Sequence, residues 1–358
     1  MSSLNVSALQ RANRPFNRPF SRRSFLTIAG ISLASTALAL TGCGNQSAGA
    51  ATSGAAGGGL KKVRIGVPGA DGTLLESALI AQRKKYLEDE LKKVGYEPAY
   101  QGFAQAGPAI NEAFSSGSLD ITEYADFPGY SAIAKGIDIK AFAVTNSSSQ
   151  FGVYASKASG ASELKDLKGK KIVVGFGTAI HHYLLNALKA VGLSSQDVEL
   201  INSTMDGPTM VASGQADAYT SVLYAIYAQQ SKIPGKLVAS TLDHDELTST
   251  FLMLYRSEYA KENPKVAPAI VRALKRAYEE ATSKPEEAYK QLVTASIPEE
   301  VLRKAYPSDF KYFNPQITDD VKKKVESLGE FMVANKLAAR KVTADEYFDT
   351  EVYQKASK

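Results

Sequence analysis

Short runs of β-branched and apolar residues alternate along the chain with longer segments in which apolar residues recur every three or four positions. The run Ile172, Val173 and Val174 is typical of a buried parallel strand. A helical spacing of apolar positions follows over residues 183–191, and Gly192 is expected to end that helix. Strands that alternate with helices in this way predict an α/β fold, in which a mostly parallel sheet is flanked by helices.

The same order of features occurs twice in the body of the chain. Residues 61–67 and residues 170–176 share a pattern of two lysines, an apolar run and a glycine. Each copy then has a Gly-Thr pair, a Gly-Pro pair and a Ser-Gly-x-x-Asp segment, at 72–73, 107–108 and 116–120 in the first copy and at 177–178, 207–208 and 213–217 in the second. Ligands bind beyond the carboxyl ends of parallel strands, so two facing copies predict a two-lobed, hinged binding protein with its ligand cleft between the lobes.

The repeat also predicts the domain organisation. In the first copy we expect strands at 63–67, 98–103, 119–124 and 137–145, and helices at 73–94 and 109–114. Hinge crossings are expected near 146–150 and 241–250, after which residues 251–255 rejoin the first sheet. Lobe one should therefore comprise residues 61–146 and 250–358, and lobe two residues 147–249. Two apolar stripes should pack as helices on lobe one: Ala267, Ile270, Val271, Leu274 and Tyr278, and then Val321, Val325, Leu328 and Met332.

The helix start after Gly177 is the expected anion site. Thr178 is the natural N-cap residue, and the first amides of a helix are unpaired and carry partial positive charge. An acidic side chain at the third helical position often compensates this charge, but here that position is His181. An anion from outside could therefore bind there. In the first copy, Thr73 and Glu76 match a capping box, so that helix start is expected to be satisfied internally.

The N-terminal segment has the features of an export signal. Residues 1–42 contain five arginines and no acid, and Ser21 to Leu26 resembles the twin-arginine signal. An apolar segment, 28–40, is too short for a permanent membrane helix. Leu40 to Cys43 then matches the lipobox of bacterial lipoproteins, which predicts a signal peptide over 1–42 and lipidation of Cys43. The protein is thus expected to face the periplasm or cell exterior, held to a membrane through a flexible tether, 43–60.

Charge and composition exclude several function classes. The chain has 42 basic and 37 acidic residues, and without the five arginines of residues 1–42 both numbers are 37. The body is therefore neutral and carries no basic patch for nucleic acid. The only cysteine is Cys43, so an internal disulfide or a cysteine-based site is excluded. His181, His182 and His244 lack the usual zinc spacing, and we expect neither a metal nor a cofactor.

Three motifs resemble those of a known family. Gly175 to His181 is similar to its Gly-x-Gly-Ser-Ser-Ala-His segment, Ala125 to Pro128 to Gly-Asp-Ala-Pro, and Ser213 to Tyr219 to Ser-Gly-x-x-Asp-Ala-Trp. Over about residues 60–335 the chain thus resembles the substrate-binding subunits of bacterial ABC importers, in the aliphatic-sulfonate and taurine-binding family with its nitrate-, bicarbonate- and thiamine-precursor-binding relatives. Ala179 replaces a family serine, and Tyr224 begins the segment that is usually Trp-Asp-Pro.

The resemblance implies a two-lobed periplasmic-binding-protein fold of type II and a monomeric protein that serves an ABC permease and its ATPase. It implies a small organic anion as ligand, an aliphatic sulfonate or taurine, captured by lobe closure. Nitrate, an aromatic sulfonate or a thiamine-precursor-like ligand stays open as an alternative, as does a sensor in place of the permease. An enzyme is the less favoured interpretation, since no Gly-x-Ser-x-Gly elbow is present.

For the anionic head we expect contacts from Gly177, the hydroxyl of Thr178, the amides of Ala179 and Ile180, and His181. The family alignment favours His181 over its neighbour, because adjacent helical positions point apart. Lobe one should contribute Gly72, Thr73, Tyr124, Ala125 and Asp126, although Asp126 could instead be a helix N-cap before Pro128. The ligand tail is expected on Tyr124, Tyr219 and Tyr224, each of which could instead be core. Asp206 could cap the next helix or contact an amine. Together, Glu76, Glu123, Asp126 and Asp206 would favour a ligand with a cationic end, such as an aminosulfonate.

Overall fold

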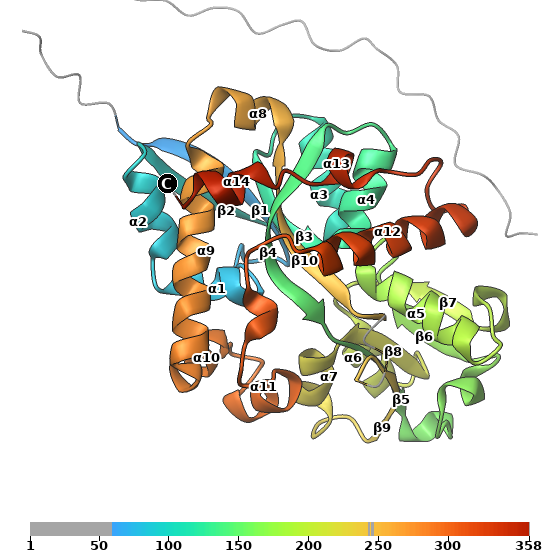
Figure 1. Cartoon of the computed structure of the whole chain (residues 1–358). Helices are drawn as coiled ribbons and strands as arrows, with labels where there is room; N and C mark the ends of the chain where they lie inside the picture. Colours follow the sequence, from blue (N-terminus) through green and yellow to red (C-terminus); the bar gives the residue numbers. More distant parts are fainter. Residues whose placement is uncertain (1–58, 243, 245–246, 358) are drawn as a thin grey trace, which may run out of the picture. The chain divides into compact units, whose positions relative to one another are not determined.

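Two five-stranded sheets organise the chain in the computed structural model, which describes residues 59–242, 244 and 247–357 (Figure 1). The first sheet has the order β2 (Tyr96–Phe103), β1 (Lys61–Pro68), β3 (Ile121–Ala125), β10 (Ser249–Arg256) and β4 (Ile139–Ser149). The second has the order β7 (Glu199–Asn202), β6 (Lys171–Val174), β8 (Ala218–Val222), β5 (Phe151–Ser156) and β9 (Gly235–Ser240). We call the first sheet with its helices lobe one and the second lobe two. The predicted signal peptide and Cys43 lie outside the described residues.

The two sheets have the same topology, which confirms the internal repeat. In each, the first strand pairs in parallel with the second and third, and one reversed strand lies between the third and the outermost strand. The reversed strand is β10 in lobe one and β5 in lobe two. Each is the strand that arrives from the other lobe, so the chain passes between sheets after β4 and again before β10. The mostly parallel α/β fold is as predicted.

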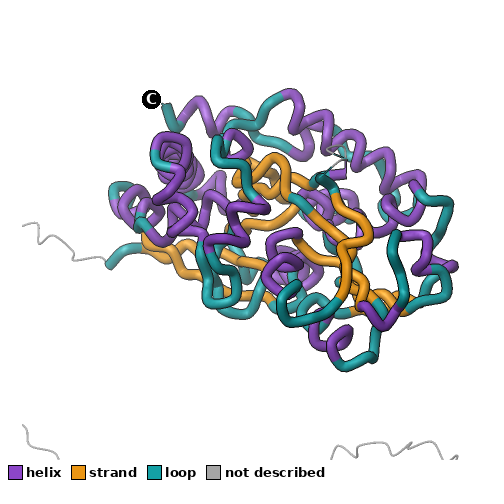
Figure 2. Tube along the Cα trace, turned by 90° about the horizontal axis from the view of Figure 1, so that it is seen from below, coloured by secondary structure: helices purple, strands orange, loops and turns teal. Residues whose placement is uncertain are grey.

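Helices cover both faces of the lobe-one sheet (Figure 2). Along β10, Leu252 and Leu254 belong to one buried cluster and Met253 and Tyr255 to another, as alternation along a strand buried on both faces requires. One face packs on α1 (Glu76–Arg83), α2 (Tyr86–Lys92) and α9 (Val266–Ser283), and the other on α3 (Gly107–Ser115), α4 (Asp126–Ala134) and α12 (Asp319–Ala334). The two predicted apolar stripes lie on α9 and α12 and are buried except for Tyr278, which is partly buried.

Lobe two is built in the same way. Its sheet packs on α5 (Ala179–Ala190) at one face and on α6 (Gly207–Ala212) and α7 (Leu223–Gln229) at the other. Ile172 and Val174 face the α5 side and Val173 the other. The remaining α-helices belong to the C-terminal part of the chain: α8 (Ser257–Glu262), α10 (Pro285–Leu292), α11 (Glu299–Ala305), α13 (Ala344–Tyr347) and α14 (Glu351–Lys355).

The predicted helix over 73–94 is wrong in two respects. It is two helices, because Lys85 adopts a left-handed backbone conformation with φ of 58° and separates α1 from α2. The capping box is also absent. Helix α1 begins at Glu76 with Leu75 as its N-cap, no side chain caps it, and Glu76 itself has φ of 50°. The carboxylate of Glu76 is instead turned into a buried network that includes Asn146.

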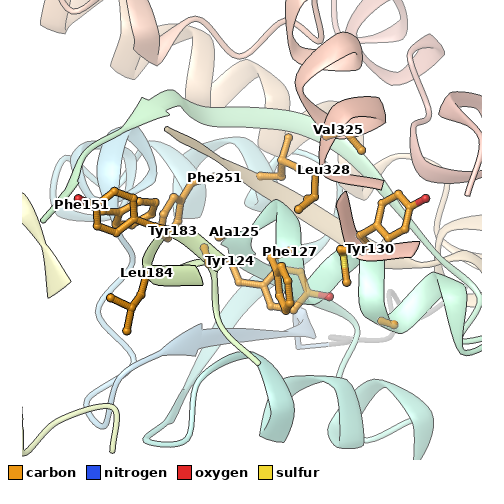
Figure 3. Close-up of a cluster of buried hydrophobic side chains, with 14 of the residues drawn as sticks. Tyr124, Ala125, Phe127, Tyr130, Phe151, Tyr183, Leu184, Phe251, Val325 and Leu328 are labelled. Atoms are coloured by element: carbon orange, nitrogen blue, oxygen red, sulfur yellow. The ribbon is translucent and has the colours of Figure 1, made fainter. Parts of the chain in front are cut away.

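One hydrophobic cluster extends across both lobes (Figure 3). Phe127 and Tyr130 on α4 and Leu328 on α12 belong to it, together with Phe151 and Tyr183 of lobe two. The lobes therefore share apolar packing close to the two crossings. Among the described residues, no helix is both long and apolar enough to span a membrane, and no group of three or more His, Cys, Asp or Glu residues is placed to hold a metal ion.

Candidate functional site

The carboxyl ends of the parallel strands of both sheets carry the residues that the repeat predicts for a ligand site. Gly72 follows β1 and Gly177 follows β6, and both have φ of 72°, a left-handed conformation that favours glycine. Ala125 is the last residue of β3. Thr73 donates its amide to Asp71 Oδ1 at 3.0 Å and is partly buried. The two Gly-Thr pairs thus occupy equivalent turns.

The start of α5 has unpaired amides, as predicted, but the hydroxyl of its N-cap residue Thr178 already donates a hydrogen bond within the protein. Thr178 is the N-cap, and its Oγ1 accepts a bond from the amide of His181 at 3.3 Å. The same hydroxyl donates to the carbonyl of Gly175 at 2.7 Å, so its single proton is not available to an anion. Donation from this hydroxyl to the ligand is therefore a wrong prediction for this arrangement. The amides of Ala179 and Ile180 meet no acceptor in the described part of the chain.

The two histidines of α5 have different surroundings. The ring of His181 folds back onto its own turn, where Nδ1 accepts from the amide of Gly177 at 3.4 Å and the ring stacks on Phe176 at 5.0 Å. His182 instead lies between Phe127 and Phe331 of lobe one, at ring-centroid distances of 5.6 and 4.6 Å. Burial, together with the nearby His181, lowers the pKa of His182 to about 4. His182 is thus a neutral packing residue at the contact between the lobes.

Backbone segments of the two lobes also meet beside the start of α5. Pro108, at the start of α3, lies against Gly177, where an added Cβ would stand 3.4 Å from the proline ring. Thr204, in the loop before α6, donates its hydroxyl to the carbonyl of Ala104 at 2.8 Å. The α5 amides therefore lie near the seam between the lobes, by which we mean the surface where residues of the two lobes are in contact.

Two buried carboxylates lie at the same seam. Glu76 is 4% exposed, and its Oε2 accepts bonds from Asn146 Nδ2 at 2.9 Å and from the hydroxyl of Tyr306 at 2.8 Å. Glu123, on β3, is fully buried, and its Oε2 accepts from the amide of Leu75 at 2.7 Å. Burial raises the pKa of Glu76 to about 7 and that of Glu123 to about 8, and the charge of Glu76 adds to the shift of Glu123.

Lobe two contributes an aromatic ring to this acidic region. Tyr224, on α7, stacks on Tyr306 at a centroid distance of 5.8 Å. Burial raises the pKa of Tyr224, and the charges of Glu76 and Glu123 raise it further. Since the hydroxyl of Tyr306 donates to Glu76, the stacked ring of Tyr224 brings lobe two beside this acidic region.

Three other predicted site residues make packing contacts or hydrogen bonds within the protein. Tyr124 is 1% exposed and donates its hydroxyl to Asn111 Oδ1 at 3.0 Å. Tyr219, also 1% exposed, packs on Tyr154 in the lobe-two core at 5.8 Å. The carboxylate of Asp126 accepts bonds from the Ser249 hydroxyl and from the amides of Thr250 and Phe127, the last two at 2.9 and 2.8 Å.

Asp206 is exposed and sits at the N-cap position of α6, but its side chain makes no capping bond. Its Oδ2 accepts from the hydroxyl of Ser203 at 2.9 Å instead. The expectation of a capping side chain is therefore wrong. Sequence reasoning also missed Asn146 as a site residue and Tyr306 altogether, because Tyr306 is 230 positions from Glu76 along the chain and no motif surrounds it.

Comparisons with known proteins place this arrangement in a family. A family model described as NMT1/THI5 like matches residues 80–288. A putative aliphatic sulfonates-binding protein of Bacillus subtilis is 26% identical over 304 residues, which are 83% of this chain and 88% of that protein. The taurine-binding periplasmic protein of Escherichia coli is 25% identical over 171 residues, 47% of this chain and 52% of that protein.

Solved structures share the fold. The alkanesulfonate-binding protein SsuA of Xanthomonas axonopodis pv. citri bound to MOPS aligns with a TM-score of 0.67 at 22% identity, over 81% of this chain and 99% of its own. The desulfurization enzyme DSZB aligns with a TM-score of 0.65 at 14% identity, over 83% and 99%. The predicted periplasmic-binding-protein fold is confirmed, and the fold alone is compatible with binding or with catalysis.

Proposed function

The chain belongs to the NMT1/THI5-like family, and from this we propose that it is the solute-binding component of an ABC importer and not an enzyme. Relatives named as aliphatic sulfonates-binding and taurine-binding proteins support a small sulfonate as the solute. The solute would enter between the lobes and shift their equilibrium toward a closed form. That form would then dock on a permease driven by an ATPase.

The observation that carries the proposal is the pair of acceptor-free amides at Ala179 and Ile180, at the start of a twelve-residue helix beside the seam. A sulfonate is a permanent anion with three acceptor oxygens, and helix N-terminal amides bind such groups without a full countercharge. Thr178 contributes by fixing the turn through its bond to Gly175. Gly177 and His181 would line the same turn.

The proposal includes export by the twin-arginine route, on the motif of residues 21–26, and lipid anchoring through Cys43, on the motif of residues 40–43. The body would act as a monomer outside the cytoplasmic membrane. A second candidate is the same role for nitrate, an aromatic sulfonate or a thiamine-precursor-like solute. The acidic region around Glu76 and Glu123, with Tyr224 in place of the tryptophan of the resembling family, favours a solute other than a plain alkanesulfonate.

Replacing Ala179 by proline tests the anion site. Proline is tolerated at the first helical position, and the extended N-cap Thr178 can precede it. It removes an amide proton that has no acceptor among the described residues, and it adds a ring at a buried position. Isothermal titration of the full chain with ethanesulfonate and taurine should show binding to the wild type. The variant should bind at least tenfold more weakly, since a hydrogen bond to a charged group contributes about 1.5–3 kcal/mol.

Asp319→Pro is the matched control, because it places proline at the first position of α12 on an exposed residue behind the extended N-cap Thr318. It should leave affinity unchanged. Thermal unfolding of both variants separates lost binding from lost folding. Unchanged affinity in a folded Ala179→Pro variant would place the anion elsewhere.

A further inference from the structure

In the described part of the chain, Glu76 and Glu123 each keep one carboxylate oxygen without a well-formed hydrogen bond. Oε2 of each residue is used, by Asn146 and Tyr306 in one case and by Leu75 in the other. Oε1 of each is buried and accepts no well-formed bond from any described residue, although the buried hydroxyl of Thr145 lies close enough to Glu123 to lower its pKa. Buried polar atoms are nearly always paired in folded proteins, so two open acceptors at one seam require an explanation.

Among the described residues, no basic side chain pairs with these two acids. In the part of the chain that the structure describes, neither glutamate forms an ion pair with a lysine, arginine or histidine. Buried Glu90 on α2 shows the contrast, because Arg272, Arg276 and Lys93 all pair with it. The pair at the seam is also unlike a metal site, since no third His, Cys, Asp or Glu from the described ranges joins it.

Resting on the function proposed above, we propose that Glu76 and Glu123 bind the nitrogen end of the solute, so that the solute carries a protonated amine or an amidine-like pair of N–H groups. An organic cation would donate to both open oxygens and stabilise the ionised form of the two carboxylates, for which the described residues supply no basic partner. Tyr224 and Tyr306 supply aromatic surface beside it, which suits a cationic nitrogen. Tyr224 reaches the acids from lobe two, so a nitrogen bound there would contact both lobes and favour closure.

The arrangement also explains a costly local feature. Glu76 adopts φ of 50°, which is unfavourable for a residue with a side chain, and it places a carboxylate where burial raises its pKa. Glutamine or leucine would be less costly to bury. A charged partner that arrives with the solute gives this glutamate a role that packing does not.

Matched ligand pairs test the inference. Titration of the full chain should compare taurine with ethanesulfonate and 3-aminopropanesulfonate with propanesulfonate, because each pair differs by one amino group. A third probe, 4-amino-2-methylpyrimidine, has an amidine-like edge and no anion. Wild type should bind the amino member of at least one pair tenfold or more tightly. Glu76→Gln and Glu123→Gln should reduce this preference to less than threefold.

Glu90→Gln is the control for removing a buried lobe-one carboxylate, and it should keep the full preference. Equal or tighter binding of the plain sulfonates would overturn this inference and leave the proposed anion site standing. Binding of the pyrimidine alone, weakened by the Glu123→Gln change, would support the nitrogen site while refuting the sulfonate head. Absence of binding by every probe would overturn both.

Discussion

Asp126 matches a motif of the resembling family that was expected to line the cleft. Its carboxylate, however, accepts hydrogen bonds from within the protein. It joins the start of α4 to the start of β10 through the Ser249 hydroxyl and the Thr250 amide. Burial raises its pKa, so the three donors offset a desolvation cost. The structure therefore favours a structural role near the return crossing.

Asp126→Ala should lower the free energy of unfolding by about 3 kcal/mol, because it leaves buried donors unpaired. Urea denaturation of the wild type and variant measures this loss. Asp126→Asn should cost less, since an amide oxygen can still accept from Thr250. Should the alanine variant keep its stability but lose solute affinity, Asp126 would be a ligand contact after all.

His182 should make stability depend on pH between about 4 and 6.5. Its pKa is lowered to about 4 in the folded protein from an ordinary 6.5, because Phe127 and Phe331 pack on its buried ring and His181 lies nearby. Between these values the unfolded chain binds more protons, so stability rises with pH across the window, by at most about 3 kcal/mol. His182→Phe should remove this increment, as measured by denaturation at pH 4.5 and 7. An unchanged difference between the two pH values would refute it.

Single residues were predictable where one local rule decided them. Thr178 caps α5 because its side-chain oxygen can accept a hydrogen bond from an otherwise unpaired amide of the first turn. The same rule failed for Glu76, whose capping-box spacing is overridden by distant partners, Asn146 and Tyr306. Local spacing cannot report a bond that forms across 230 positions of chain.

At the scale of elements, the aspartate of the repeated Ser-Gly-x-x-Asp segment makes the same hydrogen bond to the first strand of the sheet in both lobes. Asp120 accepts from the backbone amide of Arg64 on β1, and Asp217 accepts from that of Lys171 on β6, each at 2.9 Å. Both aspartates thereby fix the third strand of their sheet against the first. The motif that helped to identify the repeat is thus explained by sheet assembly, without reference to a ligand.

The two aspartates should differ in how much they stabilise the protein. Asp120 is 2% exposed and also binds the guanidinium of Arg64, whereas the partly exposed side chain of Asp217 has only the backbone bond among the described residues. Asp120→Ala should cost about 3 kcal/mol and Asp217→Ala about 1 kcal/mol. Chemical denaturation of both variants provides the comparison, and equal costs would contradict it.

Strands and long helices followed from hydrophobic periodicity because each is buried in a regular way. The sequence located the strands of lobe one to within a few residues, and both C-terminal apolar stripes proved to be helix faces. It missed the break between α1 and α2, since Lys84 and Lys85 have no helix-breaking chemistry. Lysine has no particular preference for a left-handed backbone conformation, so the residue type of Lys85 does not predict the break.

At the scale of the whole described body, the two lobes share one apolar cluster and one acidic seam. The cluster joins Phe151 and Tyr183 to Phe127 (Figure 3). The repeat predicted two lobes with facing strand ends, but not which side chains would meet. Tyr224 and Tyr306 come from separate lobes and depend on how the sheets are docked, so only the structure brings them to Glu76 and Glu123.

The acidic seam should make the solute-free protein less stable as pH rises from about 4.5 to 8. Glu76 and Glu123 have folded pKa values of about 7 and about 8 against an ordinary 4.5, so the folded state binds more protons across this window and loses stability as they leave. The titratable groups facing them are Tyr224, Tyr306 and Tyr312, which stay neutral there because burial raises their pKa values.

Thermal unfolding at pH 5.5 and 8 should therefore show a decrease in the wild type that the Glu76→Gln, Glu123→Gln double variant largely lacks. Each unit of pKa displacement corresponds to about 1.4 kcal/mol, so the decrease should be readily measured. A saturating amino-bearing solute should reverse the trend in the wild type, since its positive charge stabilises the ionised carboxylates at pH 8. Equal pH dependence in the wild type and the double variant would show that these carboxylates are not protonated in the folded protein.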